Sequence, residues 1–275
     1  KMKSENITII VNTCDGFEDC WIPFFTLLKT YWPACSAKIL LTTYKKNFTF
    51  EGLDIECLLS SKNNSSELQW SDNLTLALDE YVKTDLVLLM LDDFFICDFV
   101  DDNTINKSVE IMKRDNLSNI TLTNHDTKRI YHKTENPLLS EIDQKSPYRV
   151  TTSPALWKRA SLKKYLRKDE NIWMFEVLGT RRSYNIKDSF FRVNESNIAT
   201  GFQEVIPYFQ GVDDTGIVKG KWQKGIERVF ETAGIEIDFT KRGFYKKLPG
   251  IINKYYLIKN LMQNPKILYK AFLGK

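Results

Sequence analysis

Short apolar runs alternate with segments of helical apolar spacing along the first 125 residues. β-Branched and leucine-rich runs bounded by polar residues predict strands, whereas apolar residues spaced three and four apart predict helices. The predicted strands are 6–12, 37–43, 53–59, 84–91 and 119–124, and the predicted helices are 18–32, 71–82 and 102–114. This alternation is typical of a mostly parallel sheet with helices on both faces. The pattern therefore predicts an α/β fold with a mixed, mostly parallel sheet flanked by helices.

The most apolar of these strands runs directly into two carboxylates. Residues 84–91 read TDLVLLML, and Asp92 and Asp93 follow before the chain becomes apolar again at Phe94. A continuous apolar run indicates a strand covered on both faces, and ligands of such sheets lie beyond the carboxyl ends of the strands. Adjacent carboxylates repel each other in semi-apolar surroundings, and a cation or a hydrogen-bonded sugar would relieve this. The pattern favours a ligand site; the alternative is that the pair only caps the next element.

Composition narrows the classes of protein to which the chain can belong. Its 275 residues allow one large α/β domain or two small ones. The net charge of +4, from 39 basic and 35 acidic residues, is too balanced to indicate nucleic-acid binding. No uncharged apolar run approaches the roughly 20 residues that span a bilayer, and the N-terminal segment lacks the features of a signal peptide. We therefore expect a cytoplasmic protein that does not bind nucleic acid.

The five cysteines predict neither a structural zinc site nor a disulfide framework. They are odd in number, none forms a CxxC pair, and no His cluster lies near them. They are best interpreted as small apolar residues in a reducing compartment.

Three kinds of site could use an acidic pair at the end of a central strand. Phosphatases with an Asp nucleophile need DxDx[TV], which DDFFI does not match. Phosphate-cradling loops need GxGxxG or GxxxxGK[ST], and the loop after the first strand, NTCDGFED, contains neither. Glycosyltransferases of the GT-A type use a short acidic motif after a central strand to hold a divalent metal or the nucleotide-sugar. Carboxylate oxygens suit Mg²⁺ or Mn²⁺ bridging a diphosphate.

Motifs along the chain occur in an order that resembles one enzyme family. The motifs are WSDNLTLAL at 70–78, LMLDDFF at 89–95, a strand leading to Trp157, a Leu-rich helix at 162–166, a W-x-F-E element from Trp173 to Glu176, and GIVKGKW at 216–222. Their order and spacing resemble those of bacterial glycosyltransferases that assemble capsule and O-antigen polysaccharides. The resemblance covers residues 5–225. It implies a GT-A-like, Rossmann-type domain, which we assign to 1–240.

The resemblance also implies a reaction. It is the inverting transfer of a sugar from a nucleotide-sugar, with UDP the commonest nucleotide in the family, to a glycan or polyprenyl-diphosphate-linked acceptor. Such a transfer needs a general base beside the acceptor hydroxyl, and the resemblance makes Glu176 the candidate. Trp173 and Ser153 are the candidates for contacts with the sugar or the acceptor. The alternative is that NIWMFEVLG forms an amphipathic helix with Glu176 on its solvated face.

Candidate donor-binding residues lie in three further places. Thr13 and Asp15 follow the first strand, where the base and ribose lie in GT-A enzymes, although Asp-Gly is also a plain turn. Asp72 opens a predicted helix and could contact a ribose hydroxyl. Lys221, in VKGKWQKG, could reach the diphosphate, and a solvated basic loop is the alternative.

Asp93 is the predicted metal ligand and contact of the sugar-diphosphate, with Asp92 beside it. Mg²⁺ or Mn²⁺ would suit these oxygens. Many metal-dependent GT-A enzymes supply a late His as a further ligand, whereas His125 and His132 here both come early. Either that ligand is missing or no metal is used, in which case lysines of the C-terminal loop would offset the charge of the leaving group.

Residues 241–275 are predicted to form a basic, amphipathic C-terminal helical extension. From Phe244 onward the chain mixes aromatics, Leu and Ile with many Lys residues and has no Asp or Glu. Apolar side chains surrounded by Lys suit an anionic membrane surface, which would place the protein peripherally on the inner face of the cell membrane. The alternative is a helix that docks on the domain.

Two other functions share this fold prediction. The chain could be a non-catalytic protein that binds a glycan or a partner through the same cleft. A nucleotidyltransferase is the weaker alternative, because such enzymes usually carry a basic, Gly-rich loop after the first strand and NTCDGFEDC is acidic.

Overall fold

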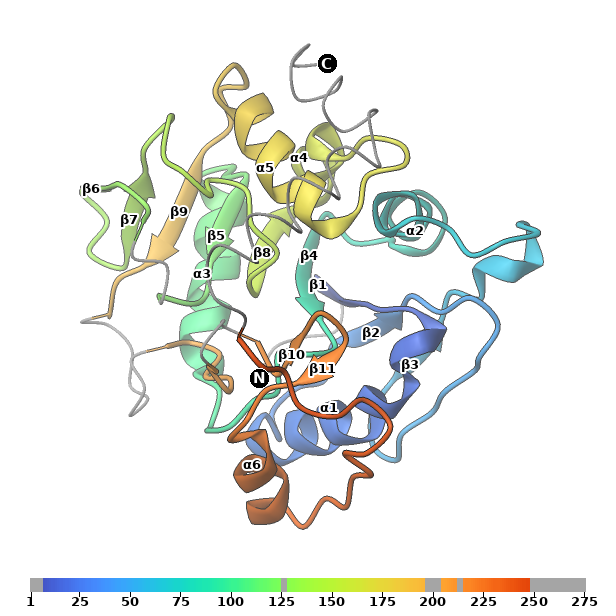
Figure 1. The fold of residues 1–275 in the computed structure, drawn as a ribbon. Coiled ribbons are helices and arrows are strands. Elements are labelled where there is room, and N and C mark those ends of the chain that lie inside the picture. Colours follow the sequence, from blue (N-terminus) through green and yellow to red (C-terminus); the bar gives the residue numbers. More distant parts are fainter. Residues whose placement is uncertain (1–6, 125–127, 196–203, 212–214, 248–275) are drawn as a thin grey trace.

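The computed structural model of the chain describes residues 7–124, 128–195, 204–211 and 215–247. Within them the chain forms a nine-stranded sheet, a two-stranded hairpin and helices on both faces of the sheet (Figure 1). The strands are β1 (Ile7–Asn12), β2 (Lys38–Leu41), β3 (Ile55–Cys57), β4 (Leu86–Leu91), β5 (Asn119–Thr121), β6 (Tyr131–Lys133), β7 (Leu139–Ile142), β8 (Ala155–Lys158), β9 (Phe190–Val193), β10 (Ile217–Val218) and β11 (Lys221–Trp222). The helices are α1 (Glu18–Tyr31), α2 (Trp70–Leu76), α3 (Asp102–Arg114), α4 (Arg159–Tyr165), α5 (Ile172–Ser183) and α6 (Ile226–Thr232), with short turns η1 (Asp15–Phe17), η2 (Ser60–Lys62) and η3 (Ala77–Tyr81).

The large sheet has the order β3-β2-β1-β4-β8-β5-β9-β7-β6. Strands β3, β2, β1 and β4 pair in parallel, β8 lies antiparallel between β4 and β5, and β5 pairs in parallel with β9. Strand β7 is antiparallel to both β9 and β6. All strands of this sheet except β8 and β7 therefore run in one direction, and the predicted mixed, mostly parallel sheet flanked by helices is confirmed.

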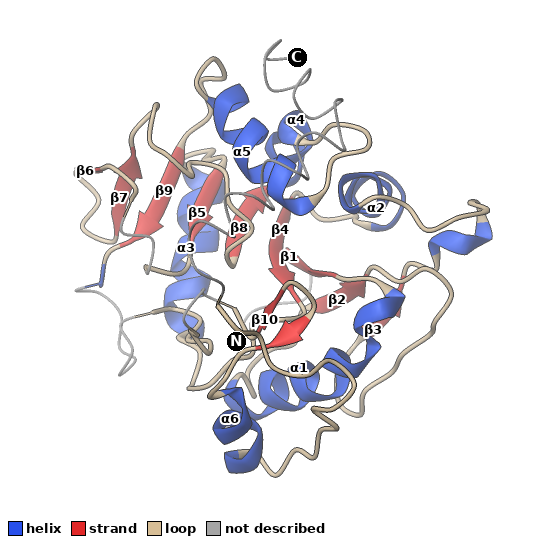
Figure 2. Ribbon diagram, in the orientation of Figure 1, coloured by secondary structure: helices blue, strands red, loops and turns tan. Residues whose placement is uncertain are grey.

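Alternating side chains of the central strands supply two hydrophobic cores. Ile9 of β1 and Leu88 of β4 belong to one core with α1, α3 and α6, whereas Ile10 and Leu89 belong to the other with α2, α4 and α5. Successive residues of a strand point to opposite faces, so a strand that is apolar at every position must be covered on both. Figure 2 shows helices on the two sides of the sheet accordingly.

Most of the predicted elements in the first half form close to their predicted ends. The helix expected at 102–114 is α3, where the Asp101 side chain caps the start by accepting a hydrogen bond from Thr104 N at 3.0 Å. The helix expected at 71–82 is α2, which continues into a single π-helical segment, η3. All five cysteines are free thiols. No helix in the described ranges is both long and apolar enough to cross a membrane.

The predicted C-terminal extension is described only at its start. Residues 241–247 lie beside the β10–β11 hairpin, because Trp222 of β11 forms a bridge with Phe244. Residues 248–275, which carry most of the predicted amphipathic extension, and His125 lie outside the described residues.

Candidate functional site

A cavity of about 420 Å³ opens beyond the carboxyl ends of β1 and β4. Its walls come from the residues after these two strands, the start of α2, the start of α5 and the turn of the β10–β11 hairpin. This is the edge of an α/β sheet at which ligands bind. Of the residues predicted from the sequence, Thr13, Asp92 and Asp93 line this cavity.

Asp92 is held by a buried chain of hydrogen bonds. Trp21 Nε1 donates to Thr13 Oγ1 at 3.0 Å, and Thr13 Oγ1 in turn donates to Asp92 Oδ2. Only 5% of Asp92 is exposed. Burial, reinforced by the negative charge of Asp93, raises the pKa of Asp92 to about 8. Burial therefore favours the neutral form of Asp92, and its hydrogen bond with Thr13 fixes the end of β4 beside the loop after β1.

The cavity is also lined by polar residues that the sequence analysis did not select, namely Asn12, Glu67, Gln69, Trp70, Asn73 and Lys219. Asn12 Oδ1 accepts a hydrogen bond from Thr42 Oγ1 at 2.6 Å, and Asn73 Nδ2 donates to Thr42 O at 3.3 Å. Because a carbonyl can only accept, the second bond fixes the orientation of the Asn73 amide. The opposite amide atoms, Asn12 Nδ2 and Asn73 Oδ1, have no hydrogen-bond partner within the described residues, and neither has Trp70 Nε1.

These unpartnered atoms leave unused hydrogen-bonding capacity in the cavity wall. A buried donor or acceptor without a partner costs about 1–3 kcal/mol, and here two donors and one acceptor belong to residues lining a single cavity. Only weak signals for these residues are present in the sequence: Asn12 ends a predicted strand, and Trp70 and Asn73 lie in the motif WSDN at the start of a predicted helix. Only the fold brings these positions together.

Asp15 and Asp72, predicted as donor-binding residues, do not line the cavity. The Asp15 carboxylate accepts hydrogen bonds from the backbone N–H groups of Tyr44, Lys45 and Lys46 at 2.8–3.2 Å. Asp72 Oδ2 accepts from Asp169 N at 3.1 Å. Each carboxylate thus holds a loop against a neighbouring segment, and for Asp15 this agrees with the alternative of a plain turn.

The hairpin presents a different lysine from the predicted one. Lys219 and Gly220 have φ angles of 51° and 74°, as in a type I′ turn, whose two central residues both need positive φ. This turn places Lys219 and Gly220 on the cavity wall. The predicted Lys221 does not line the cavity; its Nζ donates to Arg242 O at 3.3 Å.

Glu176 lies on α5, close to the segment that precedes β8. Its Oε1 accepts hydrogen bonds from Thr151 Oγ1 at 3.1 Å and from Thr152 N and Thr152 Oγ1 at 2.8 Å. Ser153 Oγ lies 3.2 Å from Thr151 Oγ1. Three donors therefore bind Oε1 of this half-buried carboxylate, and none of these three hydrogen bonds involves Oε2. The predicted residues Ser153 and Glu176 belong to one cluster.

Two features bring this cluster to the edge where the cavity lies. Antiparallel pairing of Leu89 with Ala155 puts the residues before β8 at the same edge as those after β4. On α5, Ile172 lines the cavity, and Glu176 is four residues further on, hence on the same face of the helix. Trp173, the second residue of the same helix, is 44% exposed and does not line the cavity.

The acidic side chains of the site could supply only part of the ligand set of a metal ion. No group of three or more His, Cys, Asp or Glu side chains in the described ranges could enclose a metal ion. Because burial favours the neutral form of Asp92, Asp93 is the carboxylate of the pair better suited to a cation. Mg²⁺ is commonly held by one or two carboxylates together with the phosphates of a substrate, and this donor set fits that arrangement.

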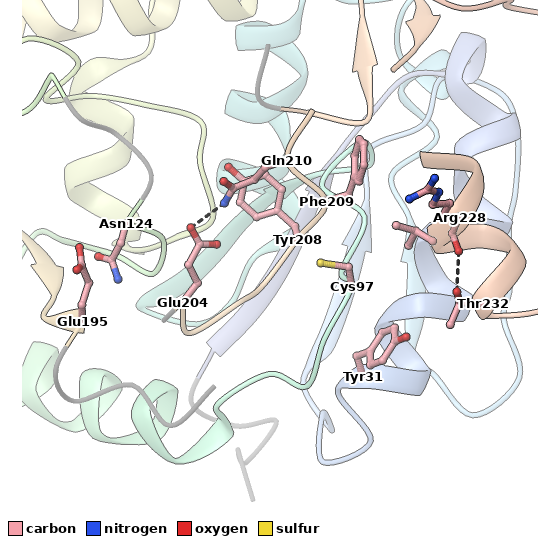
Figure 3. Close-up of a pocket in the computed structure, with 11 residues that line it drawn as sticks. Tyr31, Cys97, Asn124, Glu195, Glu204, Tyr208, Phe209, Gln210, Arg228 and Thr232 are labelled. Atoms are coloured by element: carbon pink, nitrogen blue, oxygen red, sulfur yellow. Dashed lines mark hydrogen bonds between the residues drawn. The ribbon is translucent and has the colours of Figure 1, made fainter. Parts of the chain in front are cut away.

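A second cavity of about 620 Å³ lies beside α1 and α6. Figure 3 shows Glu204 and Gln210 pointing toward each other in it, and Gln210 Nε2 donates to Glu204 Oε1 at 2.8 Å. Tyr208 also lines it and packs edge-on against Phe94 at 4.7 Å between ring centres. None of the predicted site residues lines this cavity.

The known proteins to which the chain is similar were found among solved structures. No family model matches the chain. No curated protein matches it either. One similar structure is S. aureus TarS 1–349 in complex with UDP, with a TM-score of 0.43 and 14% identity over 68% of this chain and 60% of that one. The chain covers 36% of the longer S. aureus TarS structure, at a TM-score of 0.42 and 14% identity over 68% of this chain.

Two further similar structures are of enzymes other than TarS. Glucosyl-3-phosphoglycerate synthase from Mycobacterium tuberculosis, in complex with phosphoglyceric acid, matches with a TM-score of 0.39 and 8% identity over 66% of each chain. The 4-diphosphocytidyl-2C-methyl-D-erythritol synthase from Anaerococcus prevotii matches with a TM-score of 0.41 and 10% identity, over 71% of this chain and 90% of that one. At such identities these likenesses concern the arrangement of strands and helices and not the residues of the site.

Proposed function

We propose that the chain is a nucleotide-sugar-dependent glycosyltransferase of the GT-A type. The observation that supports this best is the cavity beyond β1 and β4. An acidic pair, a lysine and three residues with unpartnered polar atoms all line this one cavity. A nucleotide diphosphate joined to a sugar offers hydrogen-bonding edges and hydroxyls that complement the amides, the indole and the carboxylates, and a negative charge that complements Lys219.

Each group has a proposed task in donor binding. The amides of Asn12 and Asn73 and the indole N–H of Trp70 hydrogen-bond the nucleoside. Lys219 attracts the diphosphate. Asp93 contacts the sugar-diphosphate and is the residue that would hold Mg²⁺ or Mn²⁺, which would neutralise charge on the diphosphate when bound.

The proposed transfer is a single displacement at the anomeric carbon. Glu176 accepts the proton of an acceptor hydroxyl while that oxygen forms a bond to the anomeric carbon. The bond from the anomeric carbon to the phosphate oxygen breaks, and the nucleoside diphosphate leaves with both bonding electrons. The anomeric centre is inverted. Trp173, whose ring is exposed at the start of α5, offers an apolar face for the acceptor sugar.

The proposed acceptor is a glycan or a polyprenyl-diphosphate-linked glycan, and the proposed process is the assembly of a surface polysaccharide. Support for both comes from the order of motifs between Trp70 and Trp222. UDP is the nucleotide we propose on the same basis.

Calorimetry with UDP, CDP, GDP and ADP tests the donor site, with and without Mg²⁺. We expect UDP to bind most tightly and Asn73→Leu to weaken binding about tenfold, since a hydrogen bond to a buried polar group is worth about 1 kcal/mol or more. Slow hydrolysis of a UDP-sugar, with the anomer of the released sugar followed by NMR, tests transfer. Binding without any hydrolysis or transfer would indicate the non-catalytic alternative, and the absence of nucleotide binding would refute the proposal.

A further inference from the structure

We propose that Arg242 is a latch that holds the β10–β11 hairpin against the loop after β1 and so sets the affinity of the cavity for a nucleotide diphosphate. The latch itself is independent of what the cavity binds, whereas its effect on affinity rests on the proposed function. Arg242 does not line the cavity, so it is a positioning residue.

The guanidinium of Arg242 joins two segments that each contribute to the wall of the cavity. Its Nη2 donates to Gly16 O at 2.8 Å, and its plane lies over the Phe17 ring, 4.4 Å from the ring centre. Its Nη1 donates weakly to Gly220 O at 3.4 Å. Phe17 and Gly220 both line the cavity. One side chain therefore connects the loop after β1 to the turn of the hairpin.

The charge of Arg242 is already matched by another residue. Arg242 Nε donates to Asp19 Oδ2 at 2.7 Å, and Nη2 donates to Asp19 Oδ1. This forked contact orients the guanidinium plane as well as neutralising it. Only 12% of the Arg242 side chain is exposed. Arg242 is thus suited to hold the hairpin by its geometry and not to attract a phosphate by its charge.

The segment that carries Arg242 is itself part of the hairpin layer. Trp222 N donates to Gly243 O at 3.0 Å, and Tyr245 N donates to Trp222 O at 2.8 Å. The Phe239 ring packs against Trp222 and Phe244, at 5.7 and 5.3 Å between ring centres. These contacts keep Arg242 at a fixed distance from β11, so movement of the hairpin away from the loop after β1 must break the Arg242 contacts.

The position of Lys219 depends on this arrangement. Lys219 and Gly220 form the turn between β10 and β11. The base of the hairpin is held by the bond from Gly216 N to Asp93 O at 3.1 Å and by the burial of Ile217 and Trp222 in the core. Without the Arg242 contacts, the turn would lose its connection to the loop after β1, while the buried base of the hairpin stayed in place. Lys219 would then lie at no fixed distance from the acidic pair, and a diphosphate bound there would lose a preorganised partner.

Hydrogen–deuterium exchange of Arg242→Ala tests the latch without any ligand. We expect exchange to become at least about tenfold faster in residues 14–17 and 217–222, the tenfold change corresponding to about 1.4 kcal/mol. The matched control is Arg114→Ala, which removes an exposed contact with Asp115 far from the hairpin in the sequence. Unchanged exchange in both segments would refute the latch. If Arg242→Ala does not fold, the same exchange measurement is made on Arg242→Lys.

Calorimetry with UDP tests the effect on affinity. We expect Arg242→Ala to bind UDP about tenfold more weakly than wild type. Arg242→Lys, which keeps the charge but not the fork, should remain weakened. Full affinity in either variant despite faster exchange would refute the positioning role. If the wild-type protein binds no nucleotide, the proposed function and the effect on affinity are both refuted. The hydrogen–deuterium exchange experiment still tests whether Arg242 holds the hairpin.

Discussion

Asp92 and Asp93 share a peptide bond but have different surroundings. Asp92 is buried against Thr13, whereas the backbone oxygen of Asp93 accepts a hydrogen bond from Gly216 N in the hairpin. Neighbouring residues after a strand point in different directions, so one can fasten the strand end while the other faces a ligand. Burial and the charge of Asp93 raise the pKa of Asp92, and the neutral form that they favour relieves part of the repulsion expected between the two carboxylates.

The raised pKa of Asp92 predicts a pH dependence of stability. Its pKa is about 8 when folded and roughly 3.9 when unfolded. Between these values the folded state holds a proton that the unfolded state has released, so the free energy of unfolding falls as pH rises. Asp92→Asn has no such titration, and its stability relative to wild type should increase across this window. Urea unfolding of metal-free protein at several pH values measures the difference.

Asp54→Asn, at an exposed position, is the matched control for that series. Its stability relative to wild type should change much less across the same window. A constant difference between Asp92→Asn and wild type at all these pH values would contradict a neutral, buried Asp92.

Glu176→Gln tests the proposed general base. The amide keeps the shape of the side chain and can still accept hydrogen bonds from Thr151 and Thr152, but it cannot take a proton. Turnover should fall by roughly two to four orders of magnitude, while calorimetry should show nearly unchanged donor binding. Glu110→Gln, exposed on α3, is the control. Lost donor binding would move Glu176 to the donor site, and normal turnover would leave it a structural residue of α5.

Among the elements, the β10–β11 hairpin depends on a glycine at its base. A Cβ atom on Gly216 would lie 2.3 Å from Phe95 Cδ2 and 3.2 Å from Asp93 O. Phe95 is fully buried and packs against Trp222 at 5.9 Å between ring centres, so the ring cannot easily move aside. The absence of a side chain at Gly216 is what lets the hairpin approach the residues after β4.

Gly216→Ala should therefore displace the hairpin and destabilise the protein. Overpacking of this kind costs about 1–3 kcal/mol, and we also expect weaker binding of UDP because Lys219 would move with the hairpin. Gly16→Ala is a matched control, since a Cβ there would meet only Cys14 Sγ at an ordinary 3.7 Å. Chemical unfolding and calorimetry of both variants measure the effects; equal stability of the two would contradict the close approach.

At the scale of the whole molecule, a buried ion pair ties the two helices beside the cavity together. Arg182 of α5 donates to both oxygens of Glu170, at 2.7 and 2.8 Å. Glu170 N in turn donates to Ser71 Oγ, and Ser71 N donates to Glu170 O, at the start of α2. The cavity wall from α2 and the helix that carries Glu176 are thereby held as one unit.

The C-terminal residues 248–275 give a prediction at the same scale. Because the segment from Phe244 onward has many Lys residues and no Asp or Glu, the full chain should sediment with phosphatidylserine-containing vesicles, and binding should weaken as salt rises. A chain ending at Lys247 should remain in the supernatant. Neutral phosphatidylcholine vesicles are the control. Failure of the full chain to bind anionic vesicles at low salt would favour a helix docked on the domain.

Local sequence determined much of the first half of this protein. The continuous apolar run before Asp92 predicted the strand β4, the alternation of elements predicted the α/β fold, and the cap at Asp101 agrees with the predicted start of α3. Periodicity and capping depend on residues a few positions apart, so a single sequence contains them. The strands β6, β7 and β9 are short and lie in a region with weaker periodicity, and they were not predicted.

The tertiary structure decided which side chains meet. The antiparallel insertion of β8 between β4 and β5 brings the Ser153 and Glu176 cluster to the edge that holds Asp92. The φ angles of one turn select Lys219 over Lys221 for the cavity wall. Arg242 reaches Gly16 across more than 200 residues of chain, with a sequence separation of 226. Contacts of this kind depend on strand order and on the packing of distant segments, and no local pattern in the sequence encodes them.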